Sequence, residues 1–181
     1  MSNLDPLLER NRAFEATGAY AGLSMLPEQP VFVVTCLDPR VDPAAFLGLD
    51  LGDAPVVRNA GGRVTEAVID DVAFISYIVG VMMTEGPLFE VAVIHHTGCG
   101  TAFLADADFR TAFAARSGID ESVLADRAVV DPEQTVATDV KRLLASPKVS
   151  DRITVAGYVY DVDTGLVRMT VPPQRPALRP V

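Results

Sequence analysis

Three side chains that could do chemistry follow one short apolar segment of the sequence. Residues 31–34, Val-Phe-Val-Val, have the β-branched content and the length of a buried strand, and Cys36, Asp38 and Arg40 come just after them. Alternate residues of an extended backbone face the same way, so a thiol, a carboxylate and a guanidinium can share one crevice. Ligands of open α/β sheets bind at the C-terminal ends of the strands. We therefore expect a functional site at this strand end.

A second strand pattern ends in a complementary set of side chains. Residues 89–94 are apolar except for Glu90 and run into His95, His96 and Cys99, the last being the second of only two cysteines. Two thiols and one imidazole at neighbouring strand ends form a Cys2His set, which leaves one position of a tetrahedral metal site open. That arrangement is typical of catalytic zinc. Adjacent residues of a strand face opposite sides, so only one of the two histidines can meet Cys99.

These residues resemble the β-class carbonic anhydrases, and the chain looks closest to the short, compact members of that family. The likeness extends over most of the chain, roughly residues 5 to 170. It rests on four segments in the order usual for the family: Cys36-x-Asp38-x-Arg40, Arg58-Asn-Ala-Gly-Gly62, His96-x-x-Cys99 and the turn pattern of residues 157–165.

The resemblance implies an enzyme, a carbonate dehydratase (a zinc lyase), with zinc bound by Cys36, His96 and Cys99. Asp38 is then either a fourth ligand or the partner of Arg40. The implied reaction is the reversible hydration of CO2 to bicarbonate and a proton by zinc-bound hydroxide. A guanidinium that pairs with the carboxylate would hold Asp38 off the metal, so the pair would gate the fourth position.

Further expectations come from the same resemblance. The H-x-x-C spacing of the family selects His96, which leaves His95 as a packed or interface residue. Family members are dimers or higher oligomers with active sites at the subunit interface, so a homodimer or homotetramer is expected. The chain has no tryptophan, so a Trp-containing regulatory bicarbonate site is not expected in that form. Gly98 stands where many relatives carry a side chain, so the surroundings of the metal should differ.

Three other functions use the same residues. A hydrolase of carbonyl sulfide or carbon disulfide would apply the same zinc chemistry to linear analogues of CO2. A redox or regulatory protein would join Cys36 and Cys99 in a reversible disulfide, but this leaves His96, Asp38 and Arg40 unexplained. An inactive zinc-binding homologue would serve only in protein interactions, and the intact carboxylate–guanidinium pair argues against it.

Composition narrows the class of protein. A length of 181 residues with 49% hydrophobic residues suits a single domain, here residues 1–171, followed by a proline-rich, extended or disordered tail at 172–181. The formal net charge of −9 disfavours non-specific nucleic-acid binding. No signal peptide or membrane-spanning segment is visible, and two cysteines in a reducing compartment favour metal chemistry. We expect a cytoplasmic protein with a small-molecule substrate.

The remaining patterns predict a mostly parallel α/β sheet with about four parallel strands and one antiparallel edge strand, flanked by helices. An N-terminal helix at residues 5–18 is expected either to pack on a partner subunit or on its own sheet, or to be an ordinary surface helix. The glycines at 61–62 predict a tight turn or a close backbone approach. Asp70 and Asp71, near the start of a long helix, suit the helix dipole better than catalysis.

The second half of the chain is harder to interpret. Residues 101–115 are expected to be helical, with apolar side chains that contact the metal pocket or simply fill the core: Phe103, Leu104, Phe109 and Phe113. Residues 116–131 have an irregular pattern. A further helix from Pro132 should bury a stripe formed by Val136, Val140, Leu143 and Leu144.

Overall fold

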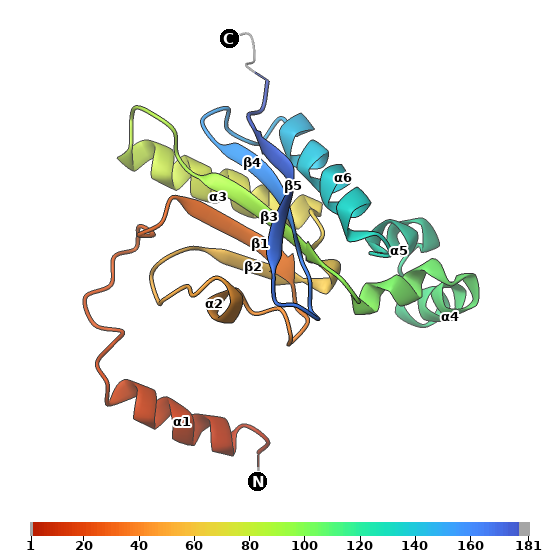
Figure 1. Cartoon of the computed structure of the whole chain (residues 1–181), viewed down its shortest axis with the longest axis horizontal. Coiled ribbons are helices and arrows are strands. Elements are labelled where there is room, and N and C mark those ends of the chain that lie inside the picture. The colour runs from red at the N-terminus through yellow and green to blue at the C-terminus, as the bar shows by residue number, and fades with distance from the viewer. Residues whose placement is uncertain (1, 178–181) are drawn as a thin grey trace.

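The computed structural model, which describes residues 2–177, has a five-stranded sheet at its centre (Figure 1). The strands lie in the order β2-β1-β3-β4-β5; the first four are parallel, and β5 is antiparallel to β4. The predicted sheet of four parallel strands and one antiparallel edge strand is confirmed. The strands are β1 (Val31–Cys36), β2 (Val56–Asn59), β3 (Glu90–His96), β4 (Thr154–Tyr160) and β5 (Val167–Gln174).

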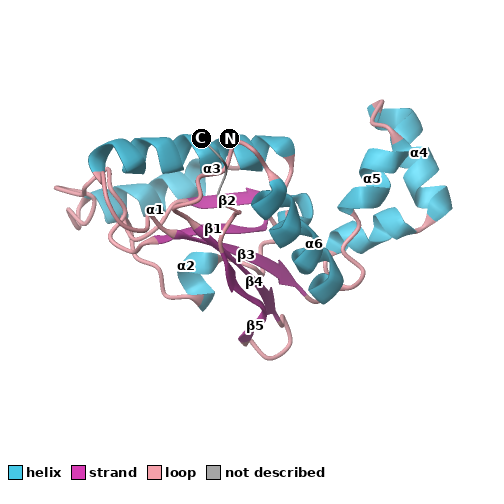
Figure 2. Cartoon of the chain, turned by 90° about the horizontal axis from the view of Figure 1, so that it is seen from above, coloured by secondary structure: helices cyan, strands magenta, loops and turns pink. Residues whose placement is uncertain are grey.

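Helices lie on both faces of this sheet, but unequally. Helix α3 (Glu66–Met82) and helix α6 (Pro132–Ala145) pack on one face, and the short α2 (Pro43–Phe46) lies on the other (Figure 2). Alternation along the strands sorts the side chains: Val34 faces the α3–α6 layer and Val33 faces α2. The apolar core is therefore largest on the α3–α6 side.

Capping residues set where these helices begin. The Asp42 side chain accepts a hydrogen bond from Ala44 N and Thr65 accepts one from Val68 N, so α2 begins at Pro43 and α3 at Glu66. Asp131 accepts hydrogen bonds from two backbone N–H groups at the start of α6, where Pro132 occupies the first turn. These caps determine which turn of each helix meets the sheet.

The N-terminal segment has almost no contact with the rest of the chain. Helix α1 (Asp5–Glu15) has no buried residue, and an extended stretch separates it from the sheet (Figure 1). Its apolar side chains are about half exposed: Leu4 51%, Leu7 49%, Leu8 45% and Phe14 42%. The alternative that this helix packs on its own sheet is therefore wrong for the isolated chain.

Residues 100–127 differ from expectation. In place of one helix they form a 3-10 helix, η2 (Gly100–Ala105), then α4 (Ala107–Ser117) and α5 (Glu121–Arg127), and the last two project away from the sheet (Figure 2). Of the apolar side chains expected here in the core, Leu104 is buried but the three phenylalanines are exposed, because η2 and α4 pack mainly on each other and on α5. The phenylalanines form an exposed aromatic row: Phe103, Phe109 and Phe113.

The C-terminal strand continues past the predicted end of the domain. Strand β5 extends to Gln174, so residues 172–174 still belong to the sheet edge. Residues 178–181 of the predicted tail lie outside the described residues. Within residues 2–177 no helix combines the length and the apolar character needed to cross a bilayer.

Candidate metal centre

A buried trio of possible metal ligands lies where strands β1 and β3 end. Cys36 is the last residue of β1, His96 is the last residue of β3, and Cys99 follows after a short turn. The turn uses Gly98 at φ 63°, a left-handed conformation that glycine adopts without strain. The ligand atoms of the three side chains lie within 4.8 Å of one another. The parallel register therefore brings together residues about sixty positions apart in the chain.

His96 is oriented to offer one nitrogen to this trio. Its Nδ1 lies 2.9 Å from the carbonyl oxygen of Thr97, and a carbonyl can only accept, so Nδ1 carries the hydrogen. Nε2 is then a bare acceptor, fully buried and without a partner among the described residues. A buried polar atom without a partner is costly. Together with two thiols, this nitrogen fits a zinc ion, which prefers sulfur and imidazole ligands.

The two thiols share a proton. Their Sγ atoms are 4.0 Å apart, and both cysteines are free and buried. The hydrogen bond from Cys36 lowers the pKa of Cys99 to about 6, with help from Thr101, whereas that same bond and burial raise the pKa of Cys36 to about 12. A divalent cation placed between the two sulfurs would replace the shared proton and allow both thiols to ionise.

Asp38 and Arg40 form a bidentate pair beside the trio. Arg40 Nε donates to Asp38 Oδ1 at 3.0 Å and Arg40 Nη2 donates to Oδ2 at 2.7 Å. The same Nη2 donates to the carbonyl oxygen of Gly98 at 2.9 Å, which links the pair to the turn before Cys99. The hydrogen bond from Arg40 lowers the pKa of Asp38 to about 2. Asp38 is thus the partner of Arg40 here and lies outside the trio.

Arg58 supports the loop that carries these residues. Its Nε donates to the carbonyl oxygen of Cys36 at 3.0 Å and its Nη2 donates to that of Asp38 at 2.8 Å. The side chain thereby fixes the backbone on both sides of Leu37. Sequence reasoning assigned no role to Arg58 beyond its place in a shared motif, because its partners are backbone carbonyls that leave no trace in side-chain patterns.

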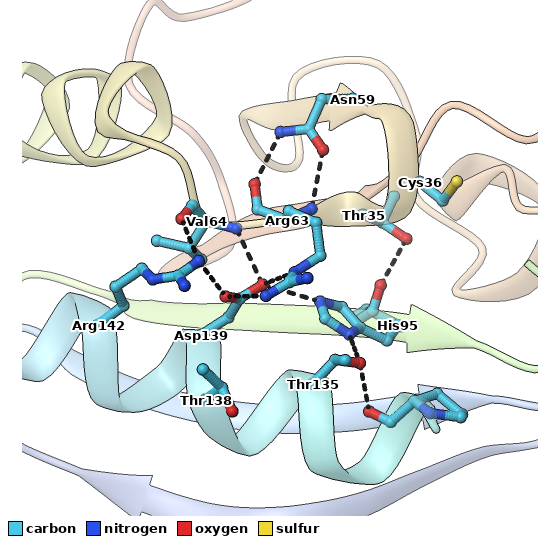
Figure 3. A network of polar contacts seen from close by, with 12 residues as sticks. Thr35, Cys36, Asn59, Arg63, Val64, His95, Thr135, Thr138, Asp139 and Arg142 are labelled. Carbon is cyan, nitrogen blue, oxygen red and sulfur yellow. Dashed lines mark hydrogen bonds and ion pairs between the residues drawn. The ribbon is translucent and has the colours of Figure 1, made fainter. Parts of the chain in front are cut away.

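His95 faces away from the trio, into a buried polar cluster (Figure 3). Its Nδ1 contacts Thr135 Oγ1 at 2.8 Å, and its Nε2 lies 3.3 Å from Asp139 Oδ2. His95 is therefore packed, as expected. Asp139 and its partner Arg63 were missed, although the sequence holds one signal: a carboxylate at position 139 interrupts the apolar stripe of its helix at a position that must be buried.

The fold is therefore that of an α/β protein with a mixed sheet, and a buried Cys2His group that could hold a transition metal lies at its strand ends. The carbonic anhydrase family model matches residues 31–167, and the chain belongs to that family. A β-carbonic anhydrase of Mycobacterium tuberculosis is 31% identical over 172 residues, which are 95% of this chain and 100% of that relative.

Two further comparisons concern a solved structure and a relative that is named for another substrate. The crystal structure of a carbonic anhydrase from Streptococcus mutans superposes with a TM-score of 0.80 at 35% identity, covering 94% of this chain and 98% of that one. A carbon disulfide hydrolase of Acidithiobacillus thiooxidans is 28% identical over 158 residues, 76% of this chain and 75% of the relative. The family thus includes relatives named for two different substrates.

Proposed function

We propose that this protein is a zinc-dependent carbonic anhydrase that catalyses the reversible hydration of CO2 to bicarbonate and a proton. The observation that carries the proposal is the buried nitrogen Nε2 of His96, which has no hydrogen-bond partner within residues 2–177 and lies beside the two cysteine sulfurs. Relatives named as carbonic anhydrases support it, since one of them is matched over its whole length.

Each residue of the site has a role in this reaction. Cys36, His96 and Cys99 would hold the zinc. When bound there, zinc supplies Lewis acidity that lowers the pKa of a water molecule toward neutrality, so that the water can attack the carbon of CO2. Three buried protein ligands leave the fourth position to water or substrate.

Asp38 orients the attacking water in this proposal. A carboxylate whose pKa is about 2 is ionised at neutral pH and is too weak a base to take a proton there. It can accept a hydrogen bond from the water and fix its direction. Arg40 holds the carboxylate through two hydrogen bonds, and we assign the pair the gating role: without Arg40, Asp38 is free to turn toward the metal and close the fourth position.

Metal content and turnover test the main proposal together. We expect one zinc per chain, and hydration of CO2 that is faster at pH 8.5 than at pH 7, because a higher pH favours loss of the proton from the attacking water. Zinc is measured by mass spectrometry and hydration by stopped-flow on the same preparation. A preparation without zinc, or one with zinc and no hydration at either pH, would overturn the proposal.

Substitutions of Asp38 and Arg40 test the gating role separately from zinc binding. We expect Asp38→Ala and Arg40→Ala to retain zinc while kcat/KM for hydration falls by about a hundredfold, the scale of loss when a reacting group is misplaced. Asp71→Ala, which removes an exposed carboxylate of helix α3, is the matched control and should keep the wild-type rate. Wild-type turnover in Arg40→Ala would refute the gating role.

Hydrolysis of carbon disulfide is the second candidate function. The observation in its favour is the relative with that name, which aligns over three quarters of this chain. The same preparation is incubated with carbon disulfide, and released sulfide is measured. Sulfide release in the absence of CO2 hydration would assign the protein to this second function. Hydration in the absence of sulfide release would assign it to the first.

We also propose that the protein works as a homodimer or as a homotetramer built from such dimers. Helix α1 exposes apolar side chains and has no buried residue within its own chain. Exposed apolar area on this scale is unfavourable in water, and a second copy of the chain can cover it.

A further inference from the structure

Asp139 is a fully buried carboxylate with an unusually complete set of partners. Its side chain has 0% exposure. Oδ2 accepts hydrogen bonds from Arg63 Nε at 2.6 Å and from Val64 N at 3.0 Å; Oδ1 accepts from Arg63 Nη2 at 3.0 Å and from Arg142 Nη1 at 2.9 Å. Burial raises the pKa of a carboxyl group, but the interactions with His95 and Arg63 outweigh it and leave the pKa of Asp139 below its ordinary value.

These partners come from separate segments of the chain. Arg63 and Val64 follow the turn at η1 (Ala60–Gly62), His95 belongs to strand β3, and Asp139 itself lies in helix α6 (Figure 3). A carboxylate bound in this way holds the three segments at fixed distances. The proposed catalysis does not use any of these side chains.

One arm of the cluster reaches toward Cys36. Asn59 bonds both backbone groups of Arg63, since its Oδ1 accepts from Arg63 N and its Nδ2 donates to Arg63 O, each at 2.8 Å. The turn enclosed by this clamp contains Gly62, which lies directly against the backbone of β1. A Cβ atom on Gly62 would stand 2.9 Å from Cys36 N. Holding Arg63 therefore holds the segment that supports Cys36.

The other arm reaches toward His96. His95 Nδ1 lies 2.8 Å from the Oγ1 atom of Thr135, a residue of helix α6 whose hydroxyl donates to Asp131 O at 3.0 Å. His95 Nε2 lies 3.3 Å from Asp139 Oδ2, an ion-pair distance without the geometry of a hydrogen bond. His95 is thus held against helix α6, and its backbone leads directly into His96 at the end of the same strand.

We infer that Asp139 is a positioning residue for the metal centre: with Arg63, His95 and Thr135 it sets the spacing between the ends of β1 and β3, and thereby between Cys36 and His96. The inference rests on the proposed function, because it assumes that this trio binds metal. Outer partners that orient ligands commonly change metal affinity by about ten- to a hundredfold.

Three variants test the inference through cobalt(II) affinity, an activity-independent readout whose absorption bands report ligand geometry. We expect Asp139→Asn to bind cobalt about ten- to a hundredfold more weakly than wild type. Thr135→Val should weaken binding about fivefold, the equivalent of one hydrogen bond, and shift the cobalt bands. Thr138→Val is the matched control, because Thr138 donates to its own helix at Gln134 O as Thr135 does at Asp131 O, and no contact among residues 2–177 joins Thr138 to His95.

Nitrogen NMR of the imidazoles supplies a second readout, since the chain has only two histidines. In the wild type we expect His96 with its hydrogen on Nδ1. Thr135→Val should perturb the His95 nitrogens, and Thr138→Val should leave them unchanged.

The outcomes separate the inference from the proposed function. Equal cobalt affinity and equal bands in wild type, Thr135→Val and Thr138→Val would overturn the inference while leaving metal binding intact. If the wild type binds neither cobalt nor zinc, the proposed function fails, and the inference fails with it. If Asp139→Asn does not fold, the comparison of Thr135→Val with Thr138→Val decides alone.

Discussion

At the scale of single residues, the two thiols dominate the behaviour of the metal centre. They differ in environment although they face each other: Cys99 has a pKa of about 6 and Cys36 a pKa of about 12. Between these values the pair carries one proton, which a bound zinc ion must expel. Metal binding at neutral pH is therefore a proton exchange.

This exchange predicts a defined pH dependence of zinc affinity. From pH 7 to pH 9 one proton is released, so the Kd for zinc should fall about tenfold per pH unit. Below pH 6 both thiols are protonated, so the Kd should rise about a hundredfold for each unit of acidification. Competition with a chromophoric chelator measures the Kd at each pH.

A cysteine variant provides the control for this prediction. In Cys36→Ser the proton held by Cys36 is gone, so zinc binds more weakly and the slope between pH 7 and pH 9 disappears. A Kd that does not change over this range in the wild type would mean that both thiols are already ionised in the free protein.

The roles of some residues at the candidate site could be predicted from the sequence, and the roles of others could not. Cys36, His96 and Cys99 could be predicted because thiols and imidazoles are few and their spacing after strands is informative. The choice of His96 over His95 needed a family resemblance as well. Asp139 could not be assigned a partner, because a carboxylate within a helix pairs with residues that only the tertiary fold brings near it.

At the scale of elements, the turn at η1 has the strictest requirement for its residue type. Gly62 has φ 65°, and a Cβ there would stand 2.8 Å from the carbonyl carbon of Thr35, closer than real contacts allow. Gly86 has a similar φ of 79° but has no atom within 4 Å of the Cβ position. Alanine at position 86 would therefore add backbone strain alone, whereas alanine at position 62 would add backbone strain and steric overlap.

We expect Gly86→Ala to lower the free energy of unfolding by about 1 kcal/mol, the cost of the left-handed conformation alone. Gly62→Ala should cost about 3 kcal/mol or more, because the backbone of β1 must also move. Urea unfolding of both variants measures the difference. Equal losses would mean that the close approach to β1 contributes nothing to stability.

Strong periodic patterns predicted the elements well, and weak ones did not. The strands and the helices α3 and α6 were predicted from apolar runs, caps and prolines within a few residues of their ends. Helix α5 was missed because Leu124 is its one buried residue, and one buried position produces no periodicity. The aromatic row of η2 and α4 was expected in the core or at the metal pocket, because composition does not reveal that these helices lie away from the sheet.

At the scale of the whole molecule, we expect formation of the proposed dimer to depend on the apolar side chains of helix α1, which lies far from the Cys2His group. Replacing Leu7 and Leu8 by aspartate removes apolar area from both copies of a dimer. Each apolar side chain contributes about 1 kcal/mol when half of its area is buried, so the dimer Kd should rise about a thousandfold. Light scattering after size exclusion measures the molar mass at several concentrations.

Arg10→Ala on the same helix is the matched control, since this exposed residue is charged and should not contribute apolar area. It should assemble like the wild type. If Leu7→Asp with Leu8→Asp keeps the wild-type molar mass at low concentration, the arm does not hold the subunits together.

The hydrogen bond from His96 Nδ1 to a backbone carbonyl determines which neighbouring residues can change without disturbing the imidazole. Its acceptor is the carbonyl oxygen of Thr97, which every amino acid would supply at that position. Exchanging residue 97 thus leaves the electron donation of the imidazole intact. By contrast, the hydroxyl of Thr101, 3.2 Å from the sulfur of Cys99, is open to exchange. In the proposed zinc site, substitutions can therefore change the surroundings of the Cys99 sulfur, while the hydrogen bond that orients the His96 imidazole stays constant.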